Sequence, residues 1–384
     1  MIFKAPILTT RELEVVKSVE EVKASLGYAL TTSRRWTGLL RRVTLARAVQ
    51  GSNSIEGYTV SVDDALAAAE GEEQPRTETW LAVAGYQMAM TYVIGLFDDP
   101  HFTYSADLLR SLHYMMMQHD LSRNPGKWRP GPIFVFDEAR KENVYEGPDA
   151  EIVPALVAEL IDSLQARNER PSLVQAAMAH LNLVMIHPFS DGNGRMARCL
   201  ETLVLARTGT LAPPFSSIEE YLGRNTRDYY EVLARVGAGT WHPERDASPW
   251  IRFCLTAHYR QAHTLLRRSK FMERVWNAIE AEVANRKLPD RMIFALADAA
   301  IGLRIRNATY RSAAEVSDNL ASRDLAVLVR EGMLVADGEK RGRTYRASTK
   351  LNELAALARD RGKIPDPFDE PEEDEPYLPG LEPG

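Results

Sequence analysis

The spacing of apolar residues along the chain is mainly that of amphipathic helices. Apolar positions recur every three to four residues, the period that places them on one helix face. The period predicts helices over 78–97, 105–118, 149–166, 172–186, 196–208, 226–236, 248–267 and 271–286. Residues 126–145 differ, because β-branched and aromatic residues flank a charged turn there, which predicts a β-hairpin. The expected fold is therefore all-α in the main, with one hairpin.

The last third of the chain has a pattern of its own. Residues 265–272 are predicted to lead into a second unit. Two short helices, 308–315 and 317–330, then precede two short strands around a turn rich in glycine and basic residues. Helix, turn, helix and basic hairpin are typical of a winged-helix domain. Residues 364–384 are rich in proline and acid, and we expect them to be disordered.

Composition narrows the class of protein. The 384 residues fit two or three domains, with 45% hydrophobic and 26% charged residues, as in a globular protein with an ample core. The net charge of -6 argues against a polycation, but leaves open a basic face on one domain. The two cysteines, Cys199 and Cys254, lie in apolar helical runs, which favours a reducing compartment. No signal peptide or membrane span is recognised, so a cytoplasmic protein is expected.

Candidate chemistry is concentrated in residues 187–198, HPFSDGNGRMAR. An apolar helix leads into His187, and a glycine-rich loop then opens another helix near Arg195. Backbone N–H groups at such a helix start, together with the helix dipole, form a site for phosphate. Arg195 and Arg198 are three residues apart, so both lie on one face of that helix, and arginine binds phosphate oxygens in pairs. Asp191 is a suitable oxygen ligand for Mg²⁺, and His187 is suited to accept a proton from an attacking hydroxyl.

The same stretch matches every fixed position of the Fic-domain signature, H-P-F-x-[D/E]-G-N-G-R-x-x-R. The resemblance implies an all-α core with a β-hairpin flap, and AMP transfer from ATP to Ser, Thr or Tyr of a protein. It implies that His187 is the base, that Asp191 holds Mg²⁺ (or Mn²⁺) and that Phe189 anchors the loop. Relatives that act as kinases carry Lys at the position of Gly194, so glycine favours AMP transfer, although phosphocholine and UMP remain open. The implied ATP-binding residues are Gly192, Asn193, Gly194, Arg195, Arg198, Tyr230 and Leu233.

A second pattern precedes the motif. Ser52, Glu56 and Gly57 fit the inhibitory pattern [S/T]-x-x-x-E-[G/N] of many Fic proteins. The resemblance implies that Glu56 pairs with Arg198 and occupies the place of the ATP γ-phosphate. The simpler interpretation is a helix that ends at Gly57. The equivalent glutamate also supports removal of AMP in some relatives, so removal is a second candidate activity.

Two further regions are compared with the family. The hairpin stands where the family has its flap, which can hold a target segment, and the residues of interest are Lys127, Trp128, Arg129 and Ile133. An ordinary surface hairpin is the alternative. Tyr230 is expected to stack on adenine and Leu233 to face it, with core packing as the alternative. The histidines of the helical runs, His113 among them, lack metal-ligand spacing and are expected to be structural.

These expectations combine into a division of the chain. An N-terminal helical arm with the inhibitory motif spans 1–105, the catalytic core 106–268, the winged-helix-like domain 269–350, and a short helix with an acidic tail 351–384. The expected partners are ATP and a hydroxyl-bearing protein, the chain itself included, with no membrane; a homodimer is left open. Lys340, Arg341 and Arg343 of the wing favour DNA as a further partner, whereas acidic Glu315, Asp318, Asp324 and Glu331 weaken that basic face. The alternative from another class is a DNA-binding regulator whose core senses a nucleotide.

Overall fold

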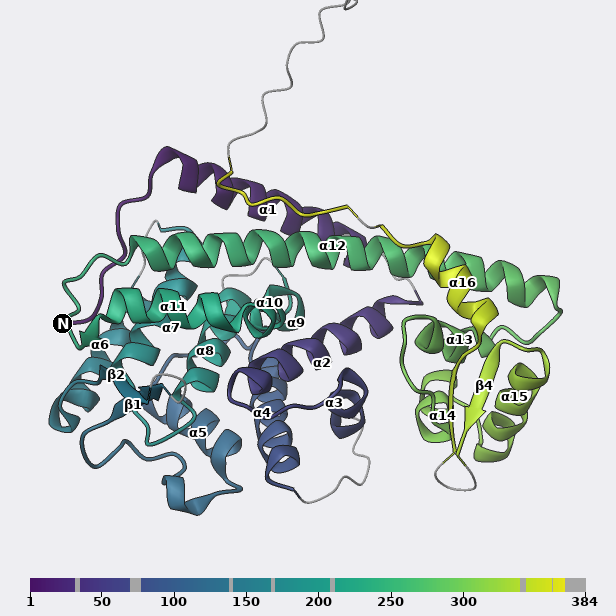
Figure 1. Cartoon of the computed structure of the whole chain (residues 1–384), viewed down its shortest axis with the longest axis horizontal. Helices are drawn as coiled ribbons and strands as arrows, with labels where there is room; N and C mark the ends of the chain where they lie inside the picture. The colour runs from purple at the N-terminus through teal and green to yellow at the C-terminus, as the bar shows by residue number, and fades with distance from the viewer. Residues whose placement is uncertain are drawn as a thin grey trace, which may run out of the picture.

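The computed structural model describes residues 1–31, 35–69, 77–137, 141–166, 170–207, 211–338, 343–360 and 362–369. Helices predominate, as predicted (Figure 1). Their bounds are α1 Thr10–Thr31, α2 Thr37–Ile55, α3 Val62–Ala69, α4 Glu78–Gly95, α5 Ala106–Met117, α6 Val153–Gln165, α7 Ser172–Ile186, α8 Asn193–Arg207, α9 Pro213–Ser216, α10 Glu219–Arg224, α11 Thr226–Gly237, α12 Ser248–Asn285, α13 Met292–Ala300, α14 Asn307–Ala314, α15 Asp318–Arg330 and α16 Thr349–Leu357. The strands are β1 Phe134–Asp137, β2 Glu142–Glu146, β3 Gly239–Thr240, β4 Leu334–Asp337 and β5 Thr344–Ala347.

The helices α7 and α8 lie in the interior of the left-hand part of the molecule in Figure 1 and frame the motif. Nearly every residue of both is buried, because α4, α5, α6, α11 and α12 surround them (Figure 1). A helix that is apolar on all sides is stable only in such a core. The loop between α7 and α8 is therefore held between two well-packed helices.

One long helix connects the two parts of the chain. α12 has 38 residues, and α1 packs along it, as Figure 1 shows. The prediction of two helices separated at 265–272 is wrong, since the helix continues without interruption. Buried positions such as Leu265, Met272 and Ile279 keep one face apolar across the predicted break, and no glycine or proline interrupts them.

The hairpin is shorter than predicted and has a third strand. β1 and β2 pair antiparallel, with a register shift between Val135 and Phe136. β3 pairs with β2 in parallel, which ties the hairpin to the end of α11. Residues 126–133, predicted as part of the hairpin, form turns and loop, because their backbone groups bond to the motif loop and to side chains instead.

The elements from α13 to β5 have the order predicted for the C-terminal domain. α14 and α15 coincide with the two predicted helices, and β4 pairs antiparallel with β5. Ile305 adds a bridge to Tyr345. The wing residues Lys340 and Arg341 lie outside the described residues, and the winged-helix assignment stays a prediction.

Part of the segment after α16, which was expected to be disordered, is ordered. The prediction of disorder is wrong for residues 364–369, which lie against α1 and α12, while 370–384 fall outside the described residues. The Arg252 guanidinium lies 4.4 Å from the Phe368 ring centroid, and Arg260 pairs with Asp366 at 3.1 Å. Arginine partners on α12 thus hold a segment whose composition predicts no structure. Within the described parts of the chain, no helix combines the length and apolar character that a membrane span needs.

Candidate active site

His187 lies directly after α7, in the left-handed conformation with φ 51°. Its Nδ1 is 3.0 Å from the carbonyl oxygen of Val184. A carbonyl only accepts, so Nδ1 carries the proton of the neutral ring, and Nε2 keeps its lone pair. Burial lowers the pKa of His187 below its ordinary value, more than the Val184 carbonyl raises it. Near neutral pH the side chain is therefore neutral and suited to accept a proton at Nε2.

Asn193 organises the loop after His187 with its side chain. Its Oδ1 accepts from the Phe189 amide at 2.9 Å, and its Nδ2 donates to the Phe189 carbonyl at 2.9 Å. Both polar atoms of the side chain are thus bonded within the loop, and its role as a phosphate ligand stays a prediction. Phe189 is fully buried, as expected of an anchor.

His113 holds this loop from α5, a role that its spacing in the sequence does not indicate. Its ring stacks on Phe189, with 3.8 Å between centroids and 9° between planes. Its Nδ1 accepts from the Gly126 amide at 2.9 Å, so Nε2 carries the proton that is donated to the Asp191 carbonyl at 3.0 Å. Burial lowers the pKa of His113 to about 4, which keeps it neutral. The prediction of a structural histidine is consistent with these contacts.

The two motif arginines are buried at the start of α8. Arg195 lies over the Tyr58 ring, with Cζ 5.3 Å from the centroid, and its Nη2 is 3.0 Å from the Met117 sulfur. Within the described residues, Nε and Nη1 of Arg195 and Nη1 of Arg198 have no hydrogen-bond partner. Unpaired N–H groups of a buried cation are costly. They fit the binding of an anion such as a phosphate chain.

Asp191 is the carboxylate best placed to bind a metal. Its Oδ1 accepts from the Gly192 amide at 2.6 Å, and its Oδ2 is 3.7 Å from Nε of Arg123. The side chain is 38% exposed. No group of three or more His, Cys, Asp or Glu in the described ranges forms a metal site. Asp191 thus fits Mg²⁺, which binds through one or two carboxylates together with substrate phosphates.

Glu56 pairs with Arg198, as the resemblance implied. Its Oε1 accepts from Arg198 Nη2 at 2.6 Å. Ser52 completes the contact: its hydroxyl accepts from Nε at 2.8 Å and its carbonyl from Nη2 at 3.0 Å. The Arg198 side chain is fully buried, whereas that of Glu56 is 24% exposed. The inhibitory pattern and the motif are therefore joined in one buried cluster.

Gly194 gives Glu56 the space for this position. A Cβ atom at residue 194 would lie 2.5 Å from Glu56 Oε1 and 3.1 Å from Arg198 Nη1. The carboxylate therefore lies against the first turn of α8, where the helix dipole favours negative charge. An anion that binds the α8 N-terminus must compete with Glu56 for this place.

The two residues predicted to meet adenine differ in exposure. Tyr230 is 45% exposed, and its hydroxyl donates to the Ile55 carbonyl at 3.2 Å, at the end of the inhibitory helix. Leu233 is 9% exposed and packs in the core. The role of Tyr230 in stacking on adenine stays a prediction, and Leu233 matches the alternative of core packing.

Arg129 does not have the expected role in target docking. It is 4% exposed, and its guanidinium donates to the backbone carbonyls of His187, Gly131 and Pro148. A buried guanidinium with three carbonyl acceptors fixes the base of the hairpin to the catalytic loop. Ile133 is partly buried beside Gly147, and its docking role stays a prediction.

Comparison with known proteins agrees with this geometry. The Fic/DOC family model matches residues 103–205. The chain is 29% identical over 214 residues to a protein adenylyltransferase Fic from Nematostella vectensis, covering 53% of this chain and 44% of that protein. It is 26% identical over 260 residues to protein adenylyltransferase fic-1 from Caenorhabditis elegans, covering 65% and 46%. The chain thus spans less than half the length of these curated relatives.

A solved structure supports the fold over most of the chain. The crystal structure of a Fic family protein from Desulfovibrio desulfuricans aligns with a TM-score of 0.57 and 23% identity, covering 90% of this chain and 98% of that one. At this identity the likeness concerns the fold. The family resemblance itself rests on residues 103–205, where the Fic/DOC family model matches and where the motif lies.

Proposed function

We propose that this protein is a protein adenylyltransferase, which transfers AMP from ATP to a Ser, Thr or Tyr hydroxyl of a protein and is inhibited by its own Glu56. The observation that carries the proposal is the pair of buried arginines at the start of α8. Their unpaired N–H groups await an anion, and Glu56 stands in for part of that anion at 2.6 Å from Arg198.

The chain supplies a base and a charge clamp for this reaction. His187 Nε2 takes the proton of the target hydroxyl as its oxygen forms a bond to the α-phosphorus. The bond from that phosphorus to the pyrophosphate oxygen breaks, and Arg195 and Arg198 neutralise the leaving charge. Asp191 would hold Mg²⁺, which neutralises phosphate charge when bound. AMP transfer thus needs the Glu56 carboxylate to leave Arg198.

Intact-protein mass spectrometry after incubation with ATP and Mg²⁺ tests the proposal. We expect an added mass of one AMP group on Glu56→Gly, less on the wild type, and none on Glu56→Gly/His187→Ala. If the chain does not modify itself, cell lysate with labelled ATP supplies other targets. Equal labelling with and without His187 in both settings would contradict the proposed base.

Removal of AMP is a second candidate, favoured by the exposure of the Glu56 carboxylate. Its side chain is 24% exposed beside the α8 N-terminus, where it can accept a proton from a water. The target is the Glu56→Gly variant after it has labelled itself with AMP. Addition of the wild type should remove this AMP, whereas addition of His187→Ala should not. Retention of the label with wild type would exclude removal on that target.

DNA binding by the C-terminal domain is proposed on one observation. Asp324, expected to weaken the basic face, is buried and pairs with Arg291, while Glu331 bonds to Arg286; Glu315 and Asp318 remain exposed. The exposed stripe of α15 carries residue types able to contact phosphates and base edges: Asn319, Ser322 and Arg323. Titration of the full chain with duplex DNA at several salt concentrations tests this, and no binding at low salt would contradict it.

A further inference from the structure

The segment that carries Glu56 contacts the C-terminal domain on both sides of that residue. We call residues 37–69, from α2 through the turn to α3, the inhibitory segment. Before Glu56, Arg42 of α2 donates from Nη2 to both carboxylate oxygens of Asp298 on α13, at 3.2 and 3.0 Å. After Glu56, Asp63 of α3 accepts from the backbone amide and Nε of Arg304, at 3.0 and 3.3 Å. The C-terminal domain thus holds the segment at two points.

Both pairs join a shielded carboxylate to a more exposed arginine. The side chains of Asp298 and Asp63 are 8% and 17% exposed, whereas those of Arg42 and Arg304 are 33% and 47% exposed. Leu66 of the inhibitory segment and Leu303 of the domain line the same small cavity, of about 10 Å³, and both are buried. That volume admits about one water. Because water has limited access to the two carboxylates, we expect these ion pairs to be stronger than pairs in which both side chains are fully exposed.

The inhibitory segment also has a close helix crossing that limits how it can move. A Cβ atom on Gly223 of α10 would lie 2.6 Å from the Cα of Gly51, one residue before Ser52. α2 is a single helix from Thr37 to Ile55, so a shift at Arg42 is carried to its end (Figure 1). On the other side, only a short turn separates Glu56 from α3, which begins at Val62. Glu56 therefore leaves Arg198 most easily when the contacts with the C-terminal domain loosen.

We propose that the C-terminal domain is a second restraint on the active site, which acts through the Arg42–Asp298 and Arg304–Asp63 pairs and keeps Glu56 on Arg198. The inference rests on the proposed function and adds its regulation. A ligand of the C-terminal domain that separates these pairs shifts the population toward the form with a free Arg198. The inhibited state is then stabilised by two sets of contacts, one at the site and one at the domain boundary.

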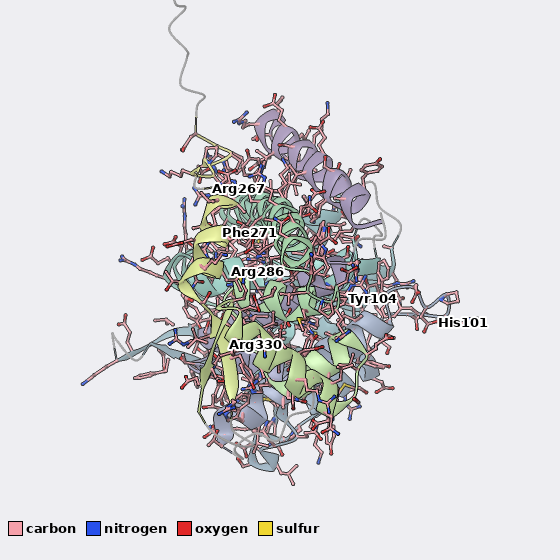
Figure 2. The ribbon with its side chains drawn as sticks, turned by 90° about the vertical axis from the view of Figure 1, so that its right-hand side faces the viewer. His101, Tyr104, Arg267, Phe271, Arg286 and Arg330 are labelled. Carbon is pink, nitrogen blue, oxygen red and sulfur yellow. The ribbon has the colours of Figure 1, made fainter. Side chains whose placement is uncertain are left out.

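Charge reversal at one pair tests the restraint. The variants are Arg304→Asp, Asp63→Arg and the double exchange of both, with Arg330→Ala as the matched control. Arg330 is an exposed arginine of the same domain, labelled in Figure 2, which views the molecule from the side of that domain. Amide hydrogen exchange of residues 50–58 reports release of the inhibitory segment, and labelling with ATP reports activity. Thermal unfolding of each variant shows that the chain remains folded.

We expect each single reversal to raise exchange of residues 50–58 and the labelling rate about 2- to 5-fold, because a partly exposed ion pair is lost. The double exchange should return the hydrogen exchange and the labelling rate toward their wild-type values. Arg330→Ala should leave both quantities unchanged. Unchanged exchange in both single variants, or no recovery in the double exchange, would overturn the restraint. Raised exchange without labelling in any form, Glu56→Gly included, would support the restraint and contradict the adenylyltransferase proposal.

Discussion

The strength of the inhibition by Glu56 follows from its contact with Arg198, and a graded pair of substitutions measures it. Glu56→Gly removes both the charge and the acceptor, whereas Glu56→Gln keeps an acceptor oxygen without the charge. The 2.6 Å hydrogen bond joins a fully buried guanidinium to a carboxylate that is 24% exposed. Hydrogen bonds to charged groups contribute about 1.5–3 kcal/mol, and about 1.4 kcal/mol corresponds to a factor of ten. We therefore expect Glu56→Gly to raise the rate of AMP transfer about 10- to 100-fold.

Glu56→Gln should give an intermediate rise of about 3- to 10-fold, since its amide oxygen still accepts from the charged Arg198 but the opposite charge of the carboxylate is lost. The assay is the initial rate of label transfer from ATP at fixed protein concentration. Glu244→Gly is the control, because Glu244 is an exposed loop glutamate that pairs with a histidine, His242. Equal rates for wild type, Gln and Gly variants, with the fold intact, would refute the argument that Glu56 competes with phosphate for Arg198.

Three further substitutions test the site. Arg129→Ala should lower the unfolding temperature by several degrees, because three backbone carbonyls lose a buried cationic donor; an unchanged unfolding temperature would argue against this role. Gly194→Ala should weaken ATP binding, measured by calorimetry, since the Cβ crowds both Glu56 and Arg198, and unaltered affinity would contradict the crowding. Burial raises the pKa of Glu219 to about 7, so the wild type should lose stability as pH rises from about 4.5 to 7, where only the unfolded chain releases the proton. Glu219→Gln should flatten that profile in thermal scans, and a profile as steep as that of the wild type would exclude Glu219 as its source.

Local chemistry explains why the motif could be recognised before the fold. His187, the glycine-rich loop and the two arginines are contiguous, and a helix–loop–helix places them together in any tertiary setting. The pairing of Glu56 with Arg198 needed the family resemblance, because nothing in local spacing relates two residues so far apart. The structure agrees with that pairing at 2.6 Å.

The sequence is a poorer guide to the roles of residues whose partners come from distant parts of the chain. Arg129 precedes the hairpin, and its sequence context predicts an exposed basic residue. Its guanidinium instead donates hydrogen bonds to carbonyls of the loop after α7 and of the end of the hairpin. His113 fits a structural histidine by spacing, yet its stacking on Phe189 makes it a support of the motif loop. Asn193 belongs to the motif, and only its short distances to Phe189 show that its side chain is already used.

The sequence by itself determined the all-α class, the motif loop between two helices and the order of elements in the C-terminal domain, because each depends on periodicity or on neighbouring residues. Only the tertiary structure decided that α12 is continuous, that Arg129 is buried and that the C-terminal domain touches the inhibitory segment. The physical reason is that burial and ion pairing depend on which distant surfaces meet. Asp63 and Arg304 read as ordinary surface charges until packing brings them within 3.3 Å.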